Sequence, residues 1–148
     1  MKCVTPQLKQ LLAYGLITLF CLTSTTANSD SYTSPETIDG THTIEAEGLI
    51  RLVTQDETQI IIDSRISSDR KLGFIAGSIS LPDTDTSCES LSRIIPEKSA
   101  AVVFYCNGPK CRRSDNAVVI AADCGYKNIY WFRGGIETWK ANNYPIKK

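Results

Sequence analysis

The stretch AAVVFYCNGPKCRRS, residues 100–114, contains the strongest fold signal and the strongest chemical signal in the chain. Its first six residues are all apolar or aromatic, which is typical of a short strand buried on both faces of a sheet. Cys106 follows this strand at once, a short polar loop comes next, and Ser114 opens a segment with helical spacing. In α/β sheets, ligands bind beyond the carboxyl ends of the strands, so this loop is the predicted site.

The segments on either side alternate between helix and strand patterns. Ile44, Leu49 and Val53 recur at helical spacing, whereas residues 59–63 form a β-branched run typical of a buried strand. The predicted helices cover about 44–53, 90–95, 114–124 and 136–142, and the predicted strands cover 59–63, 75–81, 100–105 and 128–132. This alternation predicts one α/β domain over residues 41–148 with a largely parallel sheet.

The first 40 residues differ in composition from the rest. Residues 11–22 (LLAYGLITLFCL) are almost wholly apolar, and a run of about a dozen residues is typical of a signal peptide and short for a membrane span. The small residues at positions 25–27 (TTA) are typical of a signal-peptidase cleavage site. Residues 1–27 are therefore predicted to be a cleaved signal peptide of a periplasmic or secreted protein. A retained membrane anchor is the alternative. Residues 28–40 are rich in Ser, Thr and Asp and are predicted to be a flexible lead-in.

Composition excludes several classes of function. Sixteen basic and 16 acidic side chains give a net charge of zero, so no basic excess exists to attract nucleic acid. His42 is the only histidine, and no clustered ligands accompany it, so we expect neither a metal site nor a cofactor. After signal cleavage we expect no stable membrane span.

The loop after the strand has the features that activate a thiol. Backbone N–H groups of such a loop and the start of the next helix can point at one centre. Lys110, Arg112 and Arg113 add positive charge nearby. These effects stabilise a thiolate, so we predict a depressed pKa for Cys106, a nucleophilic role for it and an anionic substrate. The alternative is that Cys106 is a buried core cysteine that ends a strand.

Residues 106–114 resemble the active-site loop of rhodanese-like domains, and the similarity extends well beyond the loop. Residues 62–65 (IDSR) resemble the family's strand-ending Asp-x-Arg, and residues 73–78 (GFIAGS) resemble its Gly-His-Ile-x-Gly-Ala segment. Residues 126–135 (YKNIYWFRGG) resemble its last strand and glycine turn. Order and spacing agree over about residues 43–146.

The resemblance implies a five-stranded, mainly parallel sheet with helices on both faces. It also implies a sulfurtransferase or persulfide carrier, in which Cys106 accepts a sulfane sulfur from a small anionic donor such as thiosulfate. The sulfur then passes to cyanide or to a thiol. Cys106 and Arg112 are the implied catalytic residues. The implied substrate-binding residues are Asn107, Gly108, Pro109, Lys110, Cys111 and Arg113. Backbone amides between Asn107 and Arg112 would hold the persulfide or the donor, and Arg112 and Lys110 would supply positive charge. Asp63 and Arg65 are expected to be structural.

Three departures from the family pattern matter, and the longer loop is the one that keeps the oxyanion alternatives open. Phe74 replaces the usual His, at a mostly structural position. The spacing from Cys106 to Arg112 is Cys-x5-Arg instead of Cys-x4-Arg, which resembles related domains that act on phosphate or arsenate. A phosphatase or arsenate reductase is therefore an alternative, as is a non-catalytic rhodanese-fold module that binds a partner or an anion.

The second cysteine of the loop opens one more alternative. Cys111 could resolve a persulfide or sulfenate on Cys106 by forming a disulfide, as in a thiol–disulfide protein, or could simply pack in the loop. An oxidised loop would then need a periplasmic redox partner to reduce it. Cys88 and Cys124 are expected to be structural or bystander thiols.

Overall fold

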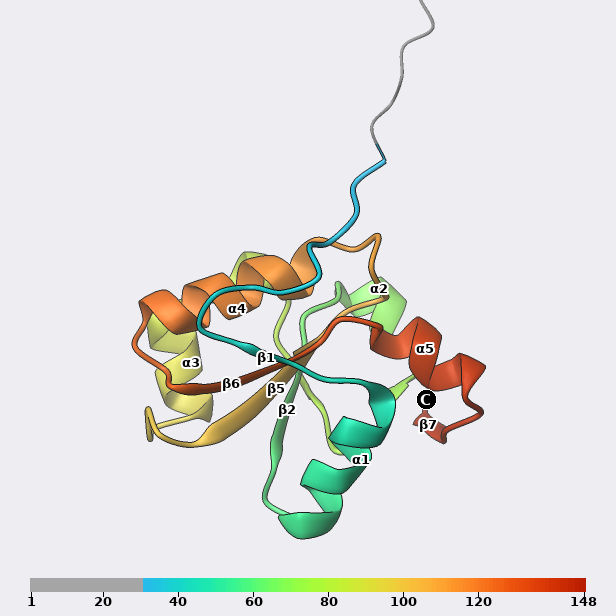
Figure 1. Ribbon diagram of the computed structural model, residues 1–148, viewed down its shortest axis with the longest axis horizontal. Coiled ribbons are helices and arrows are strands. Elements are labelled where there is room, and N and C mark those ends of the chain that lie inside the picture. The colour runs from blue at the N-terminus through green and yellow to red at the C-terminus, as the bar shows by residue number, and fades with distance from the viewer. Residues whose placement is uncertain (1–30) are drawn as a thin grey trace, which may run out of the picture.

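The computed structural model describes residues 31–148 (Figure 1). The predicted signal peptide, residues 1–27, and the first three residues of the lead-in lie outside the described residues. Between residues 31 and 148, no helix is both long enough and apolar enough to cross a membrane.

The domain is built on a five-stranded sheet in which every strand pairing is parallel. This confirms the predicted α/β class and the mainly parallel sheet. Two-residue strands form both edges, and β5 lies at the centre between β6 and β2. In spatial order the strands are β1 (His42–Thr43), β6 (Asn128–Phe132), β5 (Ala101–Tyr105), β2 (Ile60–Asp63) and β4 (Ile79–Ser80).

The single strand predicted over 75–81 is instead two short strands. β3 (Phe74–Ile75) pairs antiparallel with β7 (Ile146–Lys147) in a separate two-stranded sheet, whereas β4 joins the main sheet. A turn divides them, because the Ser78 N–H donates to the Ile75 carbonyl and Gly77 has φ +79°. Glycine adopts that left-handed conformation without a steric penalty.

Helices cover both faces of the sheet (Figure 1). On β5, Val103 and Tyr105 point toward α1 and α5, whereas Val102 and Phe104 point toward α3 and α4. The two apolar layers formed in this way are the core of the domain. The helices are α1 (Ala46–Gln55), α2 (Ser67–Arg70), α3 (Cys88–Ile94), α4 (Arg113–Asp123) and α5 (Gly135–Ala141), with a 3₁₀ turn at Asp83–Asp85.

Helix α3 begins two residues earlier than predicted because its start is capped. The Ser87 hydroxyl accepts from the Ser90 N–H at 3.1 Å, and the Ser90 hydroxyl accepts from the Ser87 N–H at 2.9 Å. This reciprocal pair satisfies two N–H groups that lack partners within the helix.

Cys88 and Cys124 form a disulfide, with their Cα atoms 5.3 Å apart. The bond links the first residue of α3 to the residue that follows α4. The expectation that both are thiols is therefore wrong. The two residues are 36 positions apart in the sequence, so no local pattern indicated the pairing. The apolar content of the chain also did not require a cross-link to stabilise the core.

Removing this disulfide should cost measurable stability. We expect Cys88→Ser/Cys124→Ser to lower the free energy of unfolding by about 3–4 kcal/mol, because the cross-link no longer restricts the unfolded chain. Urea unfolding followed by circular dichroism measures the change. The parent unfolded under strong reductant is the matched control and should lose a similar amount. A loss below about 1 kcal/mol would contradict the prediction.

Candidate functional site

Cys106 follows β5 directly, and its side chain is packed beneath the loop with 1% of its surface exposed. The Trp131 Nε1–H donates to Ser114 Oγ at 3.1 Å, and Ser114 Oγ donates to Cys106 Sγ at 3.2 Å. The Cys106 thiol in turn points at the carbonyl oxygen of Cys111, 3.1 Å away. The thiol is therefore fixed by a chain of hydrogen bonds that starts on β6.

The acid–base state of Cys106 differs from the prediction. Burial raises the pKa of the Cys106 thiol, and its interaction with the Cys111 side chain raises it further. Hydrogen bonds from the Ser114 side chain and backbone N–H oppose this rise only in part. The predicted depressed pKa is thus wrong, because the sulfur lies under the loop and is shielded from the water that would solvate a thiolate.

The thiol with the thiolate-stabilising surroundings is Cys111. The Cys106 thiol, the backbone N–H groups of Asn107 and Arg113, and the positive charge of Arg113 lower the pKa of Cys111 to about 6, although partial burial opposes them. Arg113 is also the first residue of α4, so this sulfur lies at a helix N-terminus. One of the amides expected to hold a persulfide on Cys106, that of Asn107, is therefore directed at Cys111.

The lowered pKa predicts how Cys111 responds to pH. The thiolate fraction should rise as pH increases through about 6, so iodoacetamide should label Cys111 at a nearly constant rate by pH 8. An ordinary cysteine, with a pKa of about 8.5, would still be gaining reactivity there. Peptide mapping after timed alkylation measures the rate at each cysteine. Faster labelling of Cys106 at pH 7 would contradict the prediction.

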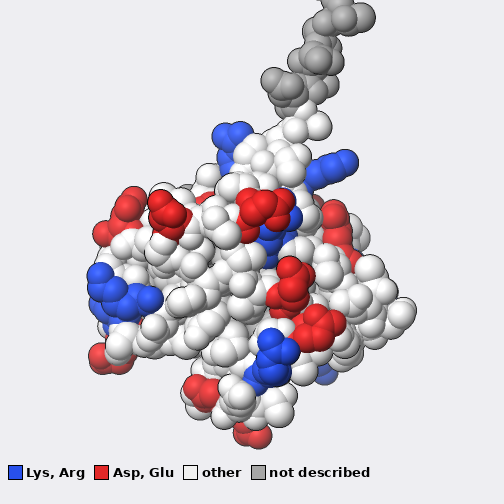
Figure 2. Space-filling view, in the orientation of Figure 1, with Lys and Arg blue, Asp and Glu red and all other residues white. Residues whose placement is uncertain are grey.

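A pocket of about 380 Å³ opens over the loop. Cys111 lines it, whereas Cys106 does not. Lys110 and Arg112 are exposed at its rim, and Arg113 bonds to Asp83 at 3.1 Å. The other lining residues are Asp69 and Asn107. In Figure 2, Lys and Arg side chains lie on both sides of the end of the domain at which the described residues begin, and acidic and basic groups are interspersed elsewhere on this face.

Part of the predicted flexible lead-in makes specific contacts with the loop and with α4. The Ser34 N–H donates to the Pro109 carbonyl at 2.7 Å, and its hydroxyl donates to Asp115 Oδ2 at 2.7 Å. The Tyr32 hydroxyl also bonds to Asp115, and the Arg112 guanidinium lies 4.1 Å from the centre of the Tyr32 ring. These contacts were not predicted from the sequence. The sequence signals were a tyrosine, a proline and an isoleucine within an otherwise polar stretch.

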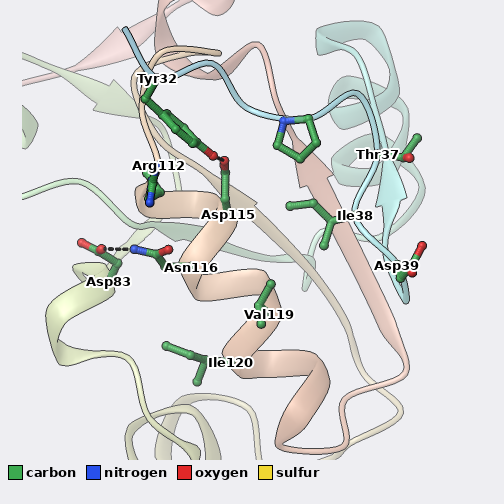
Figure 3. Close-up of a pocket in the computed structure, with 11 residues that line it drawn as sticks. Tyr32, Thr37, Ile38, Asp39, Asp83, Arg112, Asp115, Asn116, Val119 and Ile120 are labelled. Carbon is green, nitrogen blue, oxygen red and sulfur yellow. Dashed lines mark hydrogen bonds between the residues drawn. The ribbon is translucent and has the colours of Figure 1, made fainter. Parts of the chain in front are cut away.

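A larger pocket of about 820 Å³ lies between this segment and α4 (Figure 3). Figure 3 shows Tyr32, Arg112 and Asp115 together at one end and Ile38 and Val119 farther along. It shares Asp83 and Arg112 with the smaller pocket, but neither loop thiol lines it.

A buried polar network supports the loop from below. Asp63 accepts hydrogen bonds from Arg65 at 2.7 and 2.9 Å, from Arg70 at 2.9 Å and from the Tyr105 hydroxyl at 2.8 Å. Arg65 also reaches Asn107 Oδ1 at 3.5 Å. These contacts agree with the structural role expected for Asp63 and Arg65. The role of Arg70 was not predicted, because nothing in the local sequence pattern marked it.

Helix α5 fixes the backbone of the loop from the side. The Ile136 N–H donates to the Cys106 carbonyl and the Glu137 N–H donates to the Asn107 carbonyl, both at 2.9 Å. A Cβ atom on Gly108 would lie 2.5 Å from a Glu137 carboxylate oxygen. The eight predicted site residues therefore divide into three groups. Five line the pocket, Cys106 lies beneath it, and Gly108 and Pro109 anchor the loop to its neighbours.

Within residues 31–148, no group of three or more His, Cys, Asp or Glu side chains is arranged to hold a metal ion. The side chains that line the smaller pocket are instead suited to a small anion, because two exposed cations flank a polarised sulfur.

Comparisons with known proteins agree with this architecture. A family model described as "Rhodanese-like domain" matches residues 45–142. An uncharacterized protein of Buchnera aphidicola subsp. Baizongia pistaciae is 33% identical over 100 residues, which make up only 66% of this chain and 66% of that protein. The BH2092 protein from Bacillus halodurans has a TM-score of 0.63 at 25% identity, over 72% of this chain and 76% of its own. The thiosulfate sulfurtransferase from Pseudomonas aeruginosa has a TM-score of 0.62 at 20% identity, over 72% of this chain and 20% of its own, and so shares the fold alone.

Proposed function

Because the chain belongs to the rhodanese-like domain family, we propose that it is a sulfurtransferase or persulfide carrier. The match over residues 45–142 confirms the family resemblance found in the sequence. In the proposed reaction, a cysteine of the loop takes a sulfane sulfur from a small anionic donor such as thiosulfate and passes it to cyanide or to a thiol. The family resemblance assigns this role to Cys106.

The observation that carries the proposal is a polarised thiol in a pocket flanked by cations. Cys111 lines the smaller pocket, and Cys106 lies directly beneath the loop. Lys110 and Arg112 are exposed at the rim, where they can attract a dianionic donor. A thiolate attacks the outer sulfur of thiosulfate, and sulfite leaves with the electron pair of the broken S–S bond.

The oxyanion alternatives receive less support from this geometry. A phosphatase or arsenate reductase needs the loop amides and its arginine to surround the oxyanion. Here the Asn107 and Arg113 amides stabilise the Cys111 sulfur and do not surround an oxyanion. Arg113 is engaged with Asp83. A binding module without chemistry would have no need for a thiol with a lowered pKa.

Intact mass spectrometry tests the proposed function. The purified chain, with the loop thiols reduced, should gain one sulfur atom on treatment with thiosulfate and lose it again on addition of cyanide. The matched control, Cys106→Ser/Cys111→Ser, removes both loop thiols, leaves the Cys88–Cys124 disulfide in place and should gain nothing. No gain in the parent, with both loop thiols shown to be free, would refute sulfur transfer.

We propose in addition that the chain is exported to the periplasm or beyond, as residues 11–22 predict. The Cys88–Cys124 disulfide supports this, because such bonds persist in oxidising compartments. Alkylation of freshly quenched cells tests it, since both cysteines should be protected. Free thiols at both positions in most of the protein would contradict export.

A further inference from the structure

We propose that Trp131, on β6, is a positioning residue for the reaction at Cys106. By donating its indole N–H to Ser114, it directs the Ser114 hydroxyl at the sulfur of Cys106. The hydroxyl then stabilises the thiolate before the attack on the donor and the persulfide after it. This inference rests on the proposed sulfur transfer, with Cys106 as the nucleophile that the family resemblance assigns.

The three groups form a buried chain of hydrogen bonds. The Trp131 Nε1–H donates to Ser114 Oγ at 3.1 Å, and Ser114 Oγ donates to Cys106 Sγ at 3.2 Å. Trp131 is 0% exposed and the other two residues are each 1% exposed, so bulk water does not compete for these bonds. Each bond of such a chain polarises the next one, and the effect is larger away from water. The indole therefore strengthens the hydrogen bond that the hydroxyl donates to the sulfur.

The indole also restricts where the single proton of the Ser114 hydroxyl can point. Two acceptors lie near it, Cys106 Sγ at 3.2 Å and Asp115 Oδ1 at 3.4 Å. The second distance exceeds the usual limit of about 3.0 Å for an O–H···O bond, whereas sulfur is a larger acceptor. Two hydroxyl groups of the lead-in already donate to the other oxygen of Asp115. Since the Trp131 N–H approaches the hydroxyl oxygen from β6, the proton is directed at the sulfur.

A thiolate at Cys106 depends on these donors because the other neighbour of the sulfur is unfavourable. The thiol lies 3.1 Å from the carbonyl oxygen of Cys111, an acceptor that favours the protonated form. The Ser114 hydroxyl and backbone N–H favour the thiolate and oppose the effect of burial. Ser114 is also the second residue of the 11-residue helix α4, so the positive end of that helix lies beside the sulfur. A weaker bond from Ser114 should therefore reduce the reactive fraction of Cys106.

Timed alkylation of the full chain at pH 8, followed by peptide mapping, tests the proposal with two matched variants. Trp131→Phe removes the indole N–H and keeps an aromatic ring. Trp139→Phe does the same in the apolar layer on the other face of the sheet, where the Trp139 Nε1–H donates to the Pro145 carbonyl at 2.9 Å. Labelling is measured as the ratio of Cys106 to Cys111 in the same sample.

This ratio should fall about fivefold in Trp131→Phe, the change expected for one lost neutral hydrogen bond, and stay unchanged in Trp139→Phe. A ratio that is unchanged or increased in Trp131→Phe would overturn the proposal, because looser packing alone exposes Cys106 and speeds its labelling. An equal fall in both variants would overturn it as well. The charged and titratable side chains on the elements around Cys106 are the same in both variants, and they are Arg65, Cys111, Arg113, Asp115 and Glu137.

A double-mutant cycle tests whether Trp131 acts through Ser114. Ser114→Ala should lower the labelling of Cys106 at least as much as Trp131→Phe does. The double variant should lower it no further than Ser114→Ala alone, because the indole then has no hydroxyl to direct. Additive losses would overturn the proposed relay.

Two further measurements separate this proposal from the proposed function and from the folding of the Trp131 variant. Thiocyanate formation should fall by a similar factor in Trp131→Phe, and an unchanged rate would overturn the proposal. No thiocyanate from the parent would refute the proposed function, whereas the labelling ratio would still decide whether Trp131 activates the thiol. In the 15N-labelled chain, the two tryptophans give two indole N–H signals. Cys106→Ala should move the Trp131 signal upfield and leave that of Trp139 in place, because the Ser114 oxygen becomes a weaker acceptor when its proton loses the sulfur. A Trp131 signal that does not move would overturn the proposal.

Discussion

Replacing Asp63 by alanine is expected to lower the free energy of unfolding by about 3–5 kcal/mol. Asp63 is fully buried at the end of β2, and its carboxylate accepts hydrogen bonds from Arg65, Arg70 and Tyr105. Arg65 is only 2% exposed, so the substitution leaves a buried guanidinium without its counter-charge. Burial, helped by the charge of Asp63, raises the pKa of Tyr105 to about 12, so the phenol stays a protonated donor at neutral pH. Guanidinium unfolding followed by tryptophan fluorescence measures the loss.

Glu89→Ala is the matched control for this prediction. Glu89 also pairs with an arginine, Arg93, but both side chains are more than two-thirds exposed, so its removal should change stability by less than about 1 kcal/mol. Asp63→Asn keeps the shape of the side chain and should fall between the two. A loss of less than about 1 kcal/mol in Asp63→Ala would show that the buried network contributes little to stability.

The long strands and helices were predictable because each buries a continuous or periodic apolar pattern. β2 and β5 are runs of apolar residues covered on both faces, and their positions followed directly from composition. β1, β7 and α2 were not predicted. Two-residue strands and a four-residue helix are too short to show a period, and they exist because neighbouring elements supply their partners. The expected strand over 75–81 is divided by the turn at Gly77, and the two short strands on either side of the turn pair with different neighbours, β7 and β2.

The site was predictable in its location but not in its internal arrangement. The end of β5 identified the loop, and seven of the eight predicted residues lie in it, while Arg113 is the first residue of α4. Cys111 lines the smaller pocket, whereas the Cys106 thiol lies against the carbonyl oxygen of Cys111. This arrangement depends on the backbone path of the loop between Cys106 and Arg112, which the spacing of the residues does not determine. The contribution of Ser34 depends on a contact with Pro109, 75 positions away, that no local pattern encodes. The Cys88–Cys124 disulfide was not predicted for the same reason, because its two cysteines are also far apart in the sequence.

If the proposed sulfur transfer is correct, Gly135→Ala is expected to reduce its rate by about 100-fold, because the substitution displaces the loop from the side. A Cβ atom at this position would lie 2.3 Å from the Cys106 carbonyl oxygen and 2.8 Å from the carbonyl carbon and oxygen of Asn107. These are backbone atoms, so no side-chain rotation relieves the clash. The start of α5 must move away, and the 2.9 Å hydrogen bond from the Ile136 N–H to Cys106 is lost with it. Thiocyanate formation from thiosulfate and cyanide measures the rate.

Gly125→Ala separates this clash from the cost of the backbone conformation. Both glycines have positive φ, +56° at Gly135 and +88° at Gly125, so alanine is strained at either position by about 1–2 kcal/mol. A Cβ atom on Gly125 meets no atom within 4 Å, however, and that residue lies beyond the far end of α4. Gly125→Ala should therefore lose some stability and keep its transfer rate. Equal rates in the two variants, compared at a temperature at which both are folded, would mean that close packing of α5 against Cys106 does not hold the loop in its active geometry. A selective loss in Gly135→Ala would support the view that α5 sets the position of the reacting thiol through the loop backbone.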